Sequence, residues 1–186
     1  MKGLNEYINE QRAINEGSLF GDIIRTMLGW LGSSVAWAAN WFKEGVGELW
    51  KTFKNVNEKV WERGWTQFNE RNRHGYKITP PRNEKELAEV ITKITEKGTV
   101  AEKIATLEEL KKSLIDAGVD KDAVEQMFAE QVYLIATAAK ESDDSKITKE
   151  DKENARKALE ALNKNYKKYV SNAEQRTQKY NKKSKK

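Results

Sequence analysis

Apolar residues recur at steps of three and four along most of the chain, and strand-like alternation of apolar and polar residues is absent. Between residues 28 and 60 this spacing forms one continuous stripe. The stripe consists of Leu28, Leu31, Val35, Ala38, Phe42, Val46, Leu49, Phe53, Val56 and Val60. Apolar residues in this arrangement lie on one side of a helix and pack lengthwise against another helix. The pattern therefore predicts an all-α protein that begins with a long Trp-rich helix or helical hairpin.

All six tryptophans fall within residues 18–79, close to this stripe. Trp37 and Trp41 lie beside it, one helical turn apart. The resulting apolar surface is wider than one coiled-coil contact covers, and uncovered patches of that size usually mark an interface. We therefore expect residues 28–60 to be buried against another protein chain or a second copy. The expected anchors are Trp37, Trp41, Phe42, Leu49, Trp50 and Phe53.

A membrane surface is the alternative partner for this region. The stretch from Leu19 to Phe42 is mostly apolar, but Asp22 and Arg25 interrupt it. What remains is shorter than the roughly 20 residues that a spanning helix needs. A helix lying on the membrane surface fits better than a spanning helix. Packing against protein fits better than either.

Two adjacent prolines, Pro80 and Pro81, separate this region from the next, because proline does not continue a helix. Three capped amphipathic helices are predicted within residues 82–140. Their N-caps are Asn83, Thr99 and Asp120, and Gly98 and Gly118 end the first two. Helices joined by such short turns form a small antiparallel bundle, and only this part of the sequence has the pattern of a conventional core.

The last predicted region, residues 147–186, begins as a long helix with Thr148 as its N-cap. Its apolar spacing fades after Val170, so we expect the last residues to be flexible. Residues 164–186 contain nine Lys or Arg and one Glu, a charge of 9 − 1 = +8. The net charge of +5 therefore leaves 5 − 8 = −3 for the rest of the chain.

This basic segment (residues 164–186) is a candidate nucleic-acid site. Lysine-rich ends bind polyanions by releasing counterions, without reading a base sequence. We predict non-specific DNA binding, and a solubilising terminus is the simpler alternative. The lysines expected to contact DNA are Lys179, Lys182, Lys183, Lys185 and Lys186.

Composition excludes several chemistries. The chain has no cysteine, which rules out disulfides and thiolate metal ligands. Its single histidine, His74, follows a helical pattern, where a solvated side chain that favours the helix dipole is the simplest interpretation. Gly-rich phosphate loops and Ser/His/Asp sets are absent from the sequence. We therefore predict no catalytic residue, metal site or cofactor, and no enzymatic activity.

The first residues form a short motif. The chain begins Met1-Lys2-Gly3-Leu4-Asn5-Glu6-Tyr7-Ile8-Asn9-Glu10, and Ile14-Asn15-Glu16 precedes Gly17. Residues 1–17 resemble the head-targeting leader of internal head proteins of T-even-type tailed bacteriophages, which reads Met-Lys, three variable residues, Glu, Phe or Tyr, Ile, any residue, Glu. The alternative is the amphipathic start of a helix, with Leu4, Tyr7 and Ile8 on one face.

The resemblance implies cleavage by the family's prohead protease, which cuts after Glu in a Leu/Ile-x-Glu context and prefers a small residue next. Glu10 and Glu16 both fit on the upstream side. Gly17 supplies the small residue after Glu16, whereas Gln11 departs from the pattern. The leader is not a secretory signal, because Glu6 and Glu10 interrupt the apolar stretch that a signal peptide needs.

Together these features predict a non-enzymatic phage structural or internal head protein, located in the phage head or, during assembly, in the host cytoplasm. Residues 28–60 would contact capsid, scaffold or other copies, and the basic segment would contact packaged DNA. Two alternatives fit the same sequence. One is a host-directed effector delivered with the DNA, which inhibits a host enzyme or perturbs a membrane. The other is an unprocessed helical connector in a larger assembly.

Overall fold

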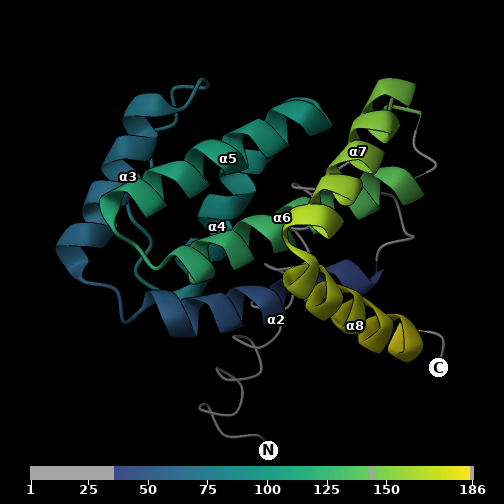
Figure 1. Ribbon diagram of the computed structural model, residues 1–186, viewed down its shortest axis with the longest axis horizontal. Coiled ribbons are helices and arrows are strands. Elements are labelled where there is room, and N and C mark those ends of the chain that lie inside the picture. Colours follow the sequence, from purple (N-terminus) through teal and green to yellow (C-terminus); the bar gives the residue numbers. More distant parts are fainter. Residues whose placement is uncertain (1–35, 143–144, 185–186) are drawn as a thin grey trace, which may run out of the picture.

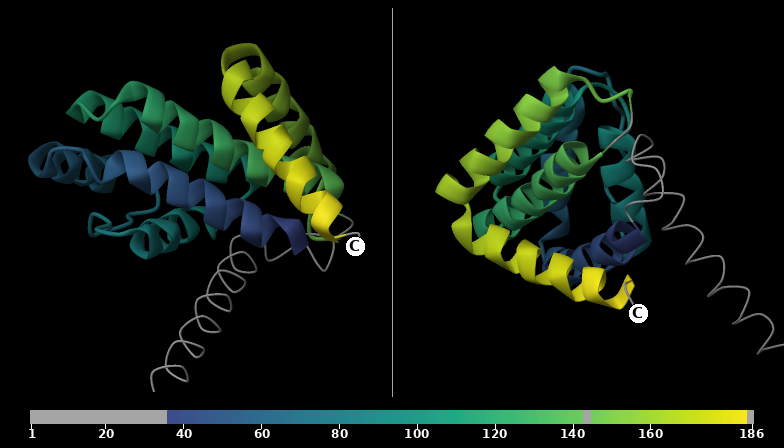
Figure 2. Two further views of the ribbon diagram at one scale, coloured as in Figure 1. Left: turned by 90° about the horizontal axis from the view of Figure 1, so that it is seen from below. Right: turned by 90° about the vertical axis from the view of Figure 1, so that its right-hand side faces the viewer.

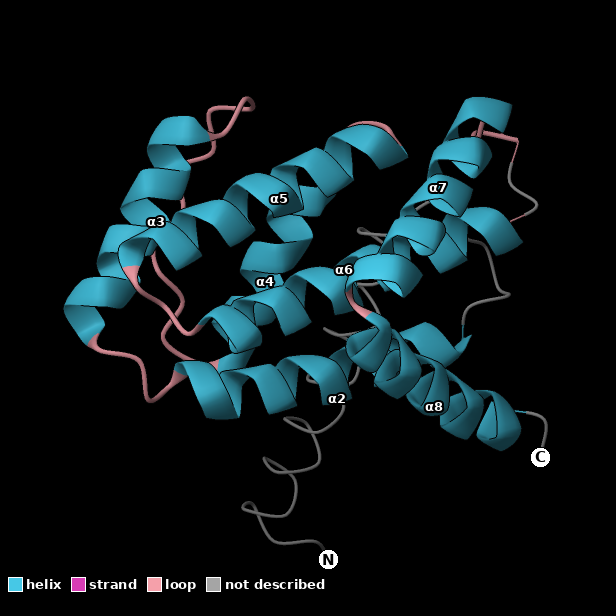
Figure 3. Ribbon diagram, in the orientation of Figure 1, coloured by secondary structure: helices cyan, strands magenta, loops and turns pink. Residues whose placement is uncertain are grey.

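All regular structure in the described part of the chain is helical. The structure is a computed structural model that describes residues 36–142 and 145–184. In this part Figure 3 shows helices joined by loops, without a strand. The helices are α2 (Ala36–Phe53), α3 (Glu58–Arg71), α4 (Glu84–Thr95), α5 (Val100–Ala117), α6 (Lys121–Glu141), α7 (Lys149–Asn165) and α8 (Lys167–Ser184). The all-α prediction is confirmed.

Local capping explains where helices α4 to α7 begin. At each start the side chain of the N-cap residue accepts a hydrogen bond from the backbone N–H three residues later, which satisfies a donor that the helix itself leaves free. These N-caps are Asn83, Thr99, Asp120 and Thr148. At the end of α5, Gly118 has a φ of 104°, a left-handed conformation that glycine adopts without strain. Each position agrees with the sequence prediction.

The apolar stripe between residues 28 and 60 is predicted to form one long helix or a helical hairpin, and its described part does not form one helix. Its described part is divided between α2 and α3. Asn57 ends the intervening turn by accepting a hydrogen bond from Lys59 N (3.0 Å), which caps α3. Asparagine side chains compete for backbone groups in this way, which favours a turn over a continued helix. Figure 1 shows α3 leaving the end of α2 in a new direction, so that the two helices form a corner.

Helix α6 is the centre of the fold. Every residue from Met127 to Ala139 is buried, whereas a surface helix buries one face only. Helices α2, α5, α7 and α8 all pack against α6, and Figure 1 shows it crossing the middle of the molecule. The other helices therefore have to cover α6 on every side.

The buried apolar side chains form a single cluster that includes residues of every described helix. Helix α7 contributes Ala155 and Leu162, and α8 contributes Val170 and Ala173. The sequence pattern predicts a conventional core only within residues 82–140, but the observed core extends beyond these residues on both sides. The reason is that α2, α7 and α8 cover the sides of α6 that α5 does not reach.

Aromatic side chains of α2 and α3 form a chain of ring contacts beside the proline loop. Trp61 is its centre. The Trp61 ring centroid lies 5.1 Å from that of Phe53 and 6.4 Å from that of Trp50. On the other side it lies 5.6 Å from Trp65, in an edge-to-face contact. Because Trp61 Nε1 also donates a hydrogen bond to Pro81 O (3.0 Å), the cluster fastens the proline loop to the corner between α2 and α3.

Close packing of α3 on α5 depends on Gly64. A Cβ atom here would lie 2.7 Å from Leu114 Cδ2 and 3.3 Å from Leu114 Cα. We predict that Gly64→Ala destabilises the protein by about 1–3 kcal/mol, because the helices must move apart. Gly47→Ala is the matched control, since its Cβ would meet only the flexible Glu84 carboxylate at 3.0 Å and above. Its higher helix propensity should raise stability by about 1 kcal/mol. Urea unfolding measures both, and equal midpoints would contradict the packing argument.

Candidate nucleic-acid interface

The candidate site is helix α8, and its direction is set by a break at Tyr166. Tyr166 (φ −134°, ψ 36°) is the non-helical residue between α7 and α8. Its N–H donates to Leu162 O (2.7 Å), and its C=O accepts from Val170 N (3.1 Å), so it closes one helix and opens the next. The long helix expected from Thr148 past Val170 is therefore two helices: the chain turns at Tyr166, and α8 continues to Ser184.

Helix α8 has a buried face that continues beyond Val170. Ala173 and Arg176 follow at steps of three, so they lie on the same side of the helix. The exposed fraction is 4 % for Val170, 0 % for Ala173 and 7 % for Arg176. The apolar spacing fades after Val170 in the sequence, but the buried face continues because a charged residue, Arg176, belongs to it. Of the last residues, which the sequence predicts to be flexible, those as far as Ser184 belong to α8.

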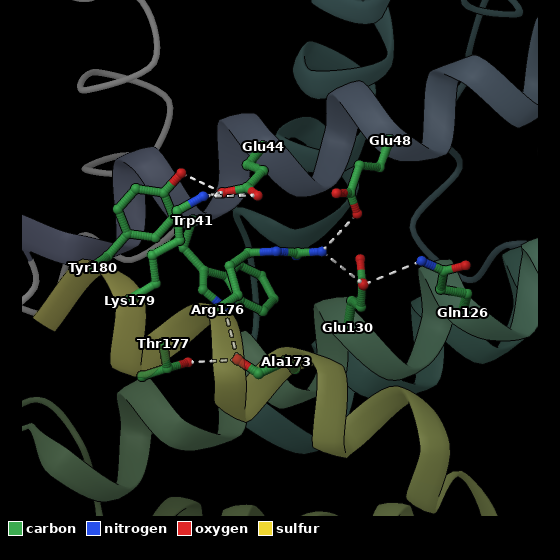
Figure 4. Close-up of polar contacts among 10 residues, drawn as sticks. All are labelled: Trp41, Glu44, Glu48, Gln126, Glu130, Ala173, Arg176, Thr177, Lys179 and Tyr180. Carbon is green, nitrogen blue, oxygen red and sulfur yellow. Dashed lines mark hydrogen bonds and ion pairs between the residues drawn. The ribbon is translucent and has the colours of Figure 1, made fainter.

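Arg176 joins three helices, as Figure 4 shows. Its Nη2 donates hydrogen bonds to Glu48 Oε2 on α2 (3.0 Å) and to Glu130 Oε1 on α6 (3.2 Å). Its Cζ lies 4.9 Å from the Trp41 ring centroid, within the range of a cation–π contact. Trp41 Nε1 in turn donates to Ala173 O of α8 (3.2 Å). One cation therefore holds α8 against both α2 and α6.

Glu130 is the most deeply buried charge of this network, with 1 % exposure. Burial raises the pKa of its carboxyl, and Arg176 opposes the rise. Gln126 Nε2 donates a further hydrogen bond to Oε1 (3.3 Å). Glu130 Oε2 and Arg176 Nη1 have no hydrogen-bond partner among the described residues. Such an ion pair adds little net stability, because desolvation offsets the attraction, but it restricts α8 to one orientation.

Gly45 on α2 makes room for this arrangement. A Cβ atom at this position would lie 2.7 Å from Arg176 Nη1 and 3.5 Å from Glu130 Oε2. A glycine inside a helix weakens it by about 1 kcal/mol relative to alanine. Here glycine allows the guanidinium to approach the α2 backbone closely.

A second set of contacts holds the C-terminal half of α8. Glu44 on α2 forms an ion pair with Lys179 (Nζ to Oε1, 3.3 Å) and accepts a hydrogen bond from the Tyr180 hydroxyl. The hydrogen bond from Tyr180 is the main cause that lowers the pKa of Glu44. The same bond raises the pKa of Tyr180 to about 12. Lys179 is predicted to be part of a flexible DNA-binding end, but its ammonium group forms an ion pair with a carboxylate of the same chain.

The opposite face of α8 is polar. Its exposed residues include Lys167, Lys168, Asn172, Gln175 and Gln178. Glu174 is the one acidic residue in the helix. In the right-hand view of Figure 2, α8 runs along an edge of the molecule, with its outer side turned away from the other described helices. A basic, exposed face of this kind attracts polyanions.

The predicted protein interface lies largely inside the molecule. Trp41 and Phe42 are 0 % exposed and Leu49 and Phe53 2 %. Helices α4, α6 and α8 pack against α2. The prediction that these four residues anchor another chain is therefore corrected, because apolar spacing indicates a buried face but not which chain covers it. Trp37 belongs to α2, and its side chain lies outside the described part.

Trp50 differs from these residues, because it is only half-buried. It lines an open groove of about 290 Å³, together with Phe53, Trp61, Pro80 and Pro81. Both acidic and basic side chains surround the groove. The groove therefore exposes part of an aromatic side chain of the Trp-rich region.

The remaining predicted residues are only partly described. The backbone of Lys182 and Lys183 belongs to α8. The residues that lie outside the described part are Lys185, Lys186 and the processing residues Glu10, Glu16 and Gly17.

Metal and membrane-spanning sites are not found in the described residues. No group of three or more His, Cys, Asp or Glu side chains there is placed to hold a metal ion. None of the described helices combines the length and the apolar character needed to cross a membrane. The exposed ring of His74 lies 5.4 Å from that of Tyr76, where it makes an aromatic contact.

Comparison with known proteins gives no match to a family model, to a curated protein or to a solved structure. Neither the fold nor the leader is attributed to a family on this basis. Helix α8 is therefore a candidate interface by its own charge and geometry alone.

The arginine network predicts unequal effects when its charges are removed. Arg176→Met leaves Glu130 buried without its cation and should destabilise the protein by about 3 kcal/mol or more. Adding Glu130→Leu should recover most of that loss, because an apolar pair replaces the buried ion pair. Glu48→Gln is the control: Glu48 is 49 % exposed, so the loss should not exceed about 1 kcal/mol. Urea unfolding measures all three, and a double variant less stable than Arg176→Met would refute this account.

The hydrogen bond between Tyr180 and Glu44 predicts an unusual titration. Tyr180 should ionise with a pKa of about 12, and Glu44→Gln should lower this value toward about 10, the ordinary value for tyrosine. Because the pKa is raised, the bond stabilises the fold fully below about pH 10. This contribution is lost as the pH rises through about 12. Ultraviolet difference spectra against Tyr180→Phe isolate this residue, and an unchanged midpoint in Glu44→Gln would disprove the assignment.

Proposed function

We propose that this chain is a non-enzymatic internal head protein of a tailed bacteriophage, which makes helical protein–protein contacts and contacts packaged DNA through α8. The observation that carries the proposal is the leader, residues 1–17, in which Ile14-Asn15-Glu16 precedes Gly17. The all-helical fold supports the proposed helical contacts, and the basic outer face of α8 supports the proposed DNA contact. The proposed location is the phage head, or the host cytoplasm during assembly, which is what the resemblance of the leader implies.

The DNA contact proposed here uses a helix instead of a flexible end. Arg176 and Lys179 pair with carboxylates of α2 and α6. The charges on the outer face that carry most of the proposed phosphate contact are therefore Lys167 and Lys168, joined by the lysines that follow residue 181 in the sequence. Lys179 is 51 % exposed beside Glu44 and adds a contact of its own. Counterion release by these lysines supplies affinity for any duplex and makes it fall steeply with salt.

The protein contacts proposed for residues 28–60 use the part of this region that the chain itself does not cover. On the described surface, the groove lined by the half-buried Trp50 is one such part. Partly exposed tryptophans are common anchors of interfaces. The proposed partners are the capsid, a scaffold protein or a second copy of the chain.

Mass spectrometry of the protein from purified phage particles tests the proposal. We expect the mature N terminus at Gly17, or at Gln11 if cleavage follows Glu10. Glu16→Ala should abolish the first product. Asn15→Ala, at the unrestricted position of the same triplet, is the matched control and should be cut normally. Absence of the protein from particles would contradict the proposal, and an intact Met1 as the sole N terminus would exclude the processing.

DNA binding should depend on salt and on the outer lysines. Deleting the end of α8 is not a clean test, because it also removes the buried Arg176. Lys167→Gln/Lys168→Gln neutralises two exposed charges instead, and Lys152→Gln/Lys157→Gln on α7 is the control with the same loss of charge. The first pair should weaken duplex binding more and reduce the log–log salt slope by about 0.9 per lost phosphate contact. Fluorescence anisotropy measures both quantities, and equal effects of the two pairs would rule out α8 as the contact.

A further inference from the structure

The outer face of α8 is not uniformly basic. Lys168, Asn172, Gln175 and Lys179 follow one another at steps of four, three and four, so they form one line along the helix. The first three are exposed, and Lys179 is 51 % exposed. The line therefore has a lysine at each end and two carboxamides between them. Counterion release alone gives no role to these central carboxamides.

The fold fixes the direction in which this line points. Arg176 and Tyr180 lie on the adjoining side of α8, with Arg176 one turn after Asn172, and carboxylates of α2 and α6 bind them there. Rotation of α8 about its own axis would break these contacts. Asn172 and Gln175 are therefore presented outward from a helix that is held in place.

The dimensions of α8 suit the major groove of B-DNA. Its 18 residues span roughly 27 Å at about 1.5 Å per residue. A helix with its side chains is about 10–12 Å across, and the major groove is about 12 Å wide. In the right-hand view of Figure 2, α8 forms an edge of the molecule, so none of the other described helices obstructs its outer side.

We propose that α8 inserts this outer face into the major groove of duplex DNA. The carboxamides of Asn172 and Gln175 contact base edges, and Lys168 and Lys179 contact the flanking phosphates. Asn and Gln side chains pair with adenine through two hydrogen bonds, to N6 and N7. Duplexes rich in A·T pairs are therefore the preferred partners. The inference rests on the DNA contact proposed above and adds a mode of recognition to it.

The charges around the line allow this docking. Glu174 lies about a quarter turn or more around the helix from the line. Lys179 already pairs with Glu44 at 3.3 Å. An ammonium group has three donors, however, so the exposed part of Lys179 can also meet a phosphate.

Binding of the full chain to three labelled duplexes of equal length tests the inference: A·T-rich DNA, G·C-rich DNA and A·U-rich RNA. The variant is Asn172→Ala/Gln175→Ala, which leaves the net charge unchanged. The matched control is Asn163→Ala/Asn165→Ala, which removes two exposed carboxamides from α7. Circular dichroism and urea unfolding establish that both variants keep the fold.

Wild type and control should bind the A·T-rich DNA at least about fivefold more tightly than the G·C-rich DNA, the minimum expected from one bidentate base contact. The variant should lose this preference with its salt dependence unchanged. RNA binding should be equal for all three proteins, because the A-form major groove is too narrow for a helix. If the variant binds both DNA duplexes as wild type does, the major-groove inference is overturned while the electrostatic contact stands. If wild type binds no duplex at low salt, the proposed DNA contact itself is overturned.

Discussion

The buried Arg176 determines the orientation of α8, the last described helix. Arg176 lies between Glu130 of α6 and Glu48 of α2 and over the ring of Trp41, so one side chain near the end of the chain joins helices from its middle and its first described part. A buried charge tolerates few geometries, because displacement leaves it unpaired in an apolar environment. The ion pair therefore fixes the rotation of α8 more than it adds to the free energy of unfolding. Which face of α8 is exposed follows from this constraint.

The same constraint makes α8 a part of the core. Helix α6 is buried from Met127 to Ala139, and Glu130 is the charged residue in that stretch. Without a cation from another helix, this carboxylate would be an unpaired charge at the centre of the fold. Arg176 arrives together with Val170 and Ala173, and α8 packs against both α2 and α6. A segment whose composition is typical of a solvated end therefore completes the core.

The helix starts can be predicted from the sequence, because a cap depends on residues only a few positions away. The ion pair that positions α8 cannot be predicted in this way, because Arg176 is 46 residues from Glu130 in the sequence. Hydrophobic periodicity also assigns both charged residues to the protein surface. Two signals are present nevertheless. Arg176 continues the three-residue spacing of Val170 and Ala173, and Glu130 stands inside an apolar run. Likewise, the spacing around Trp41 indicates a buried face, but it contains no information on whether another chain or α8 covers that face.

A basic helix that is already ordered and a flexible basic end differ in the entropy cost of binding DNA. A flexible end must be ordered on binding, at roughly 1–2 kcal/mol per residue for the backbone. In α8 the contacts with α2 and α6 already provide that order, so the DNA contact proposed for this helix does not carry that cost. The lysines of α8 also differ in their surroundings. Lys179 forms an ion pair with Glu44, whereas Lys168 is exposed on the outer face. The proposed base contacts depend on the same order, because only a helix held in one orientation would present Asn172 and Gln175 to the same groove each time.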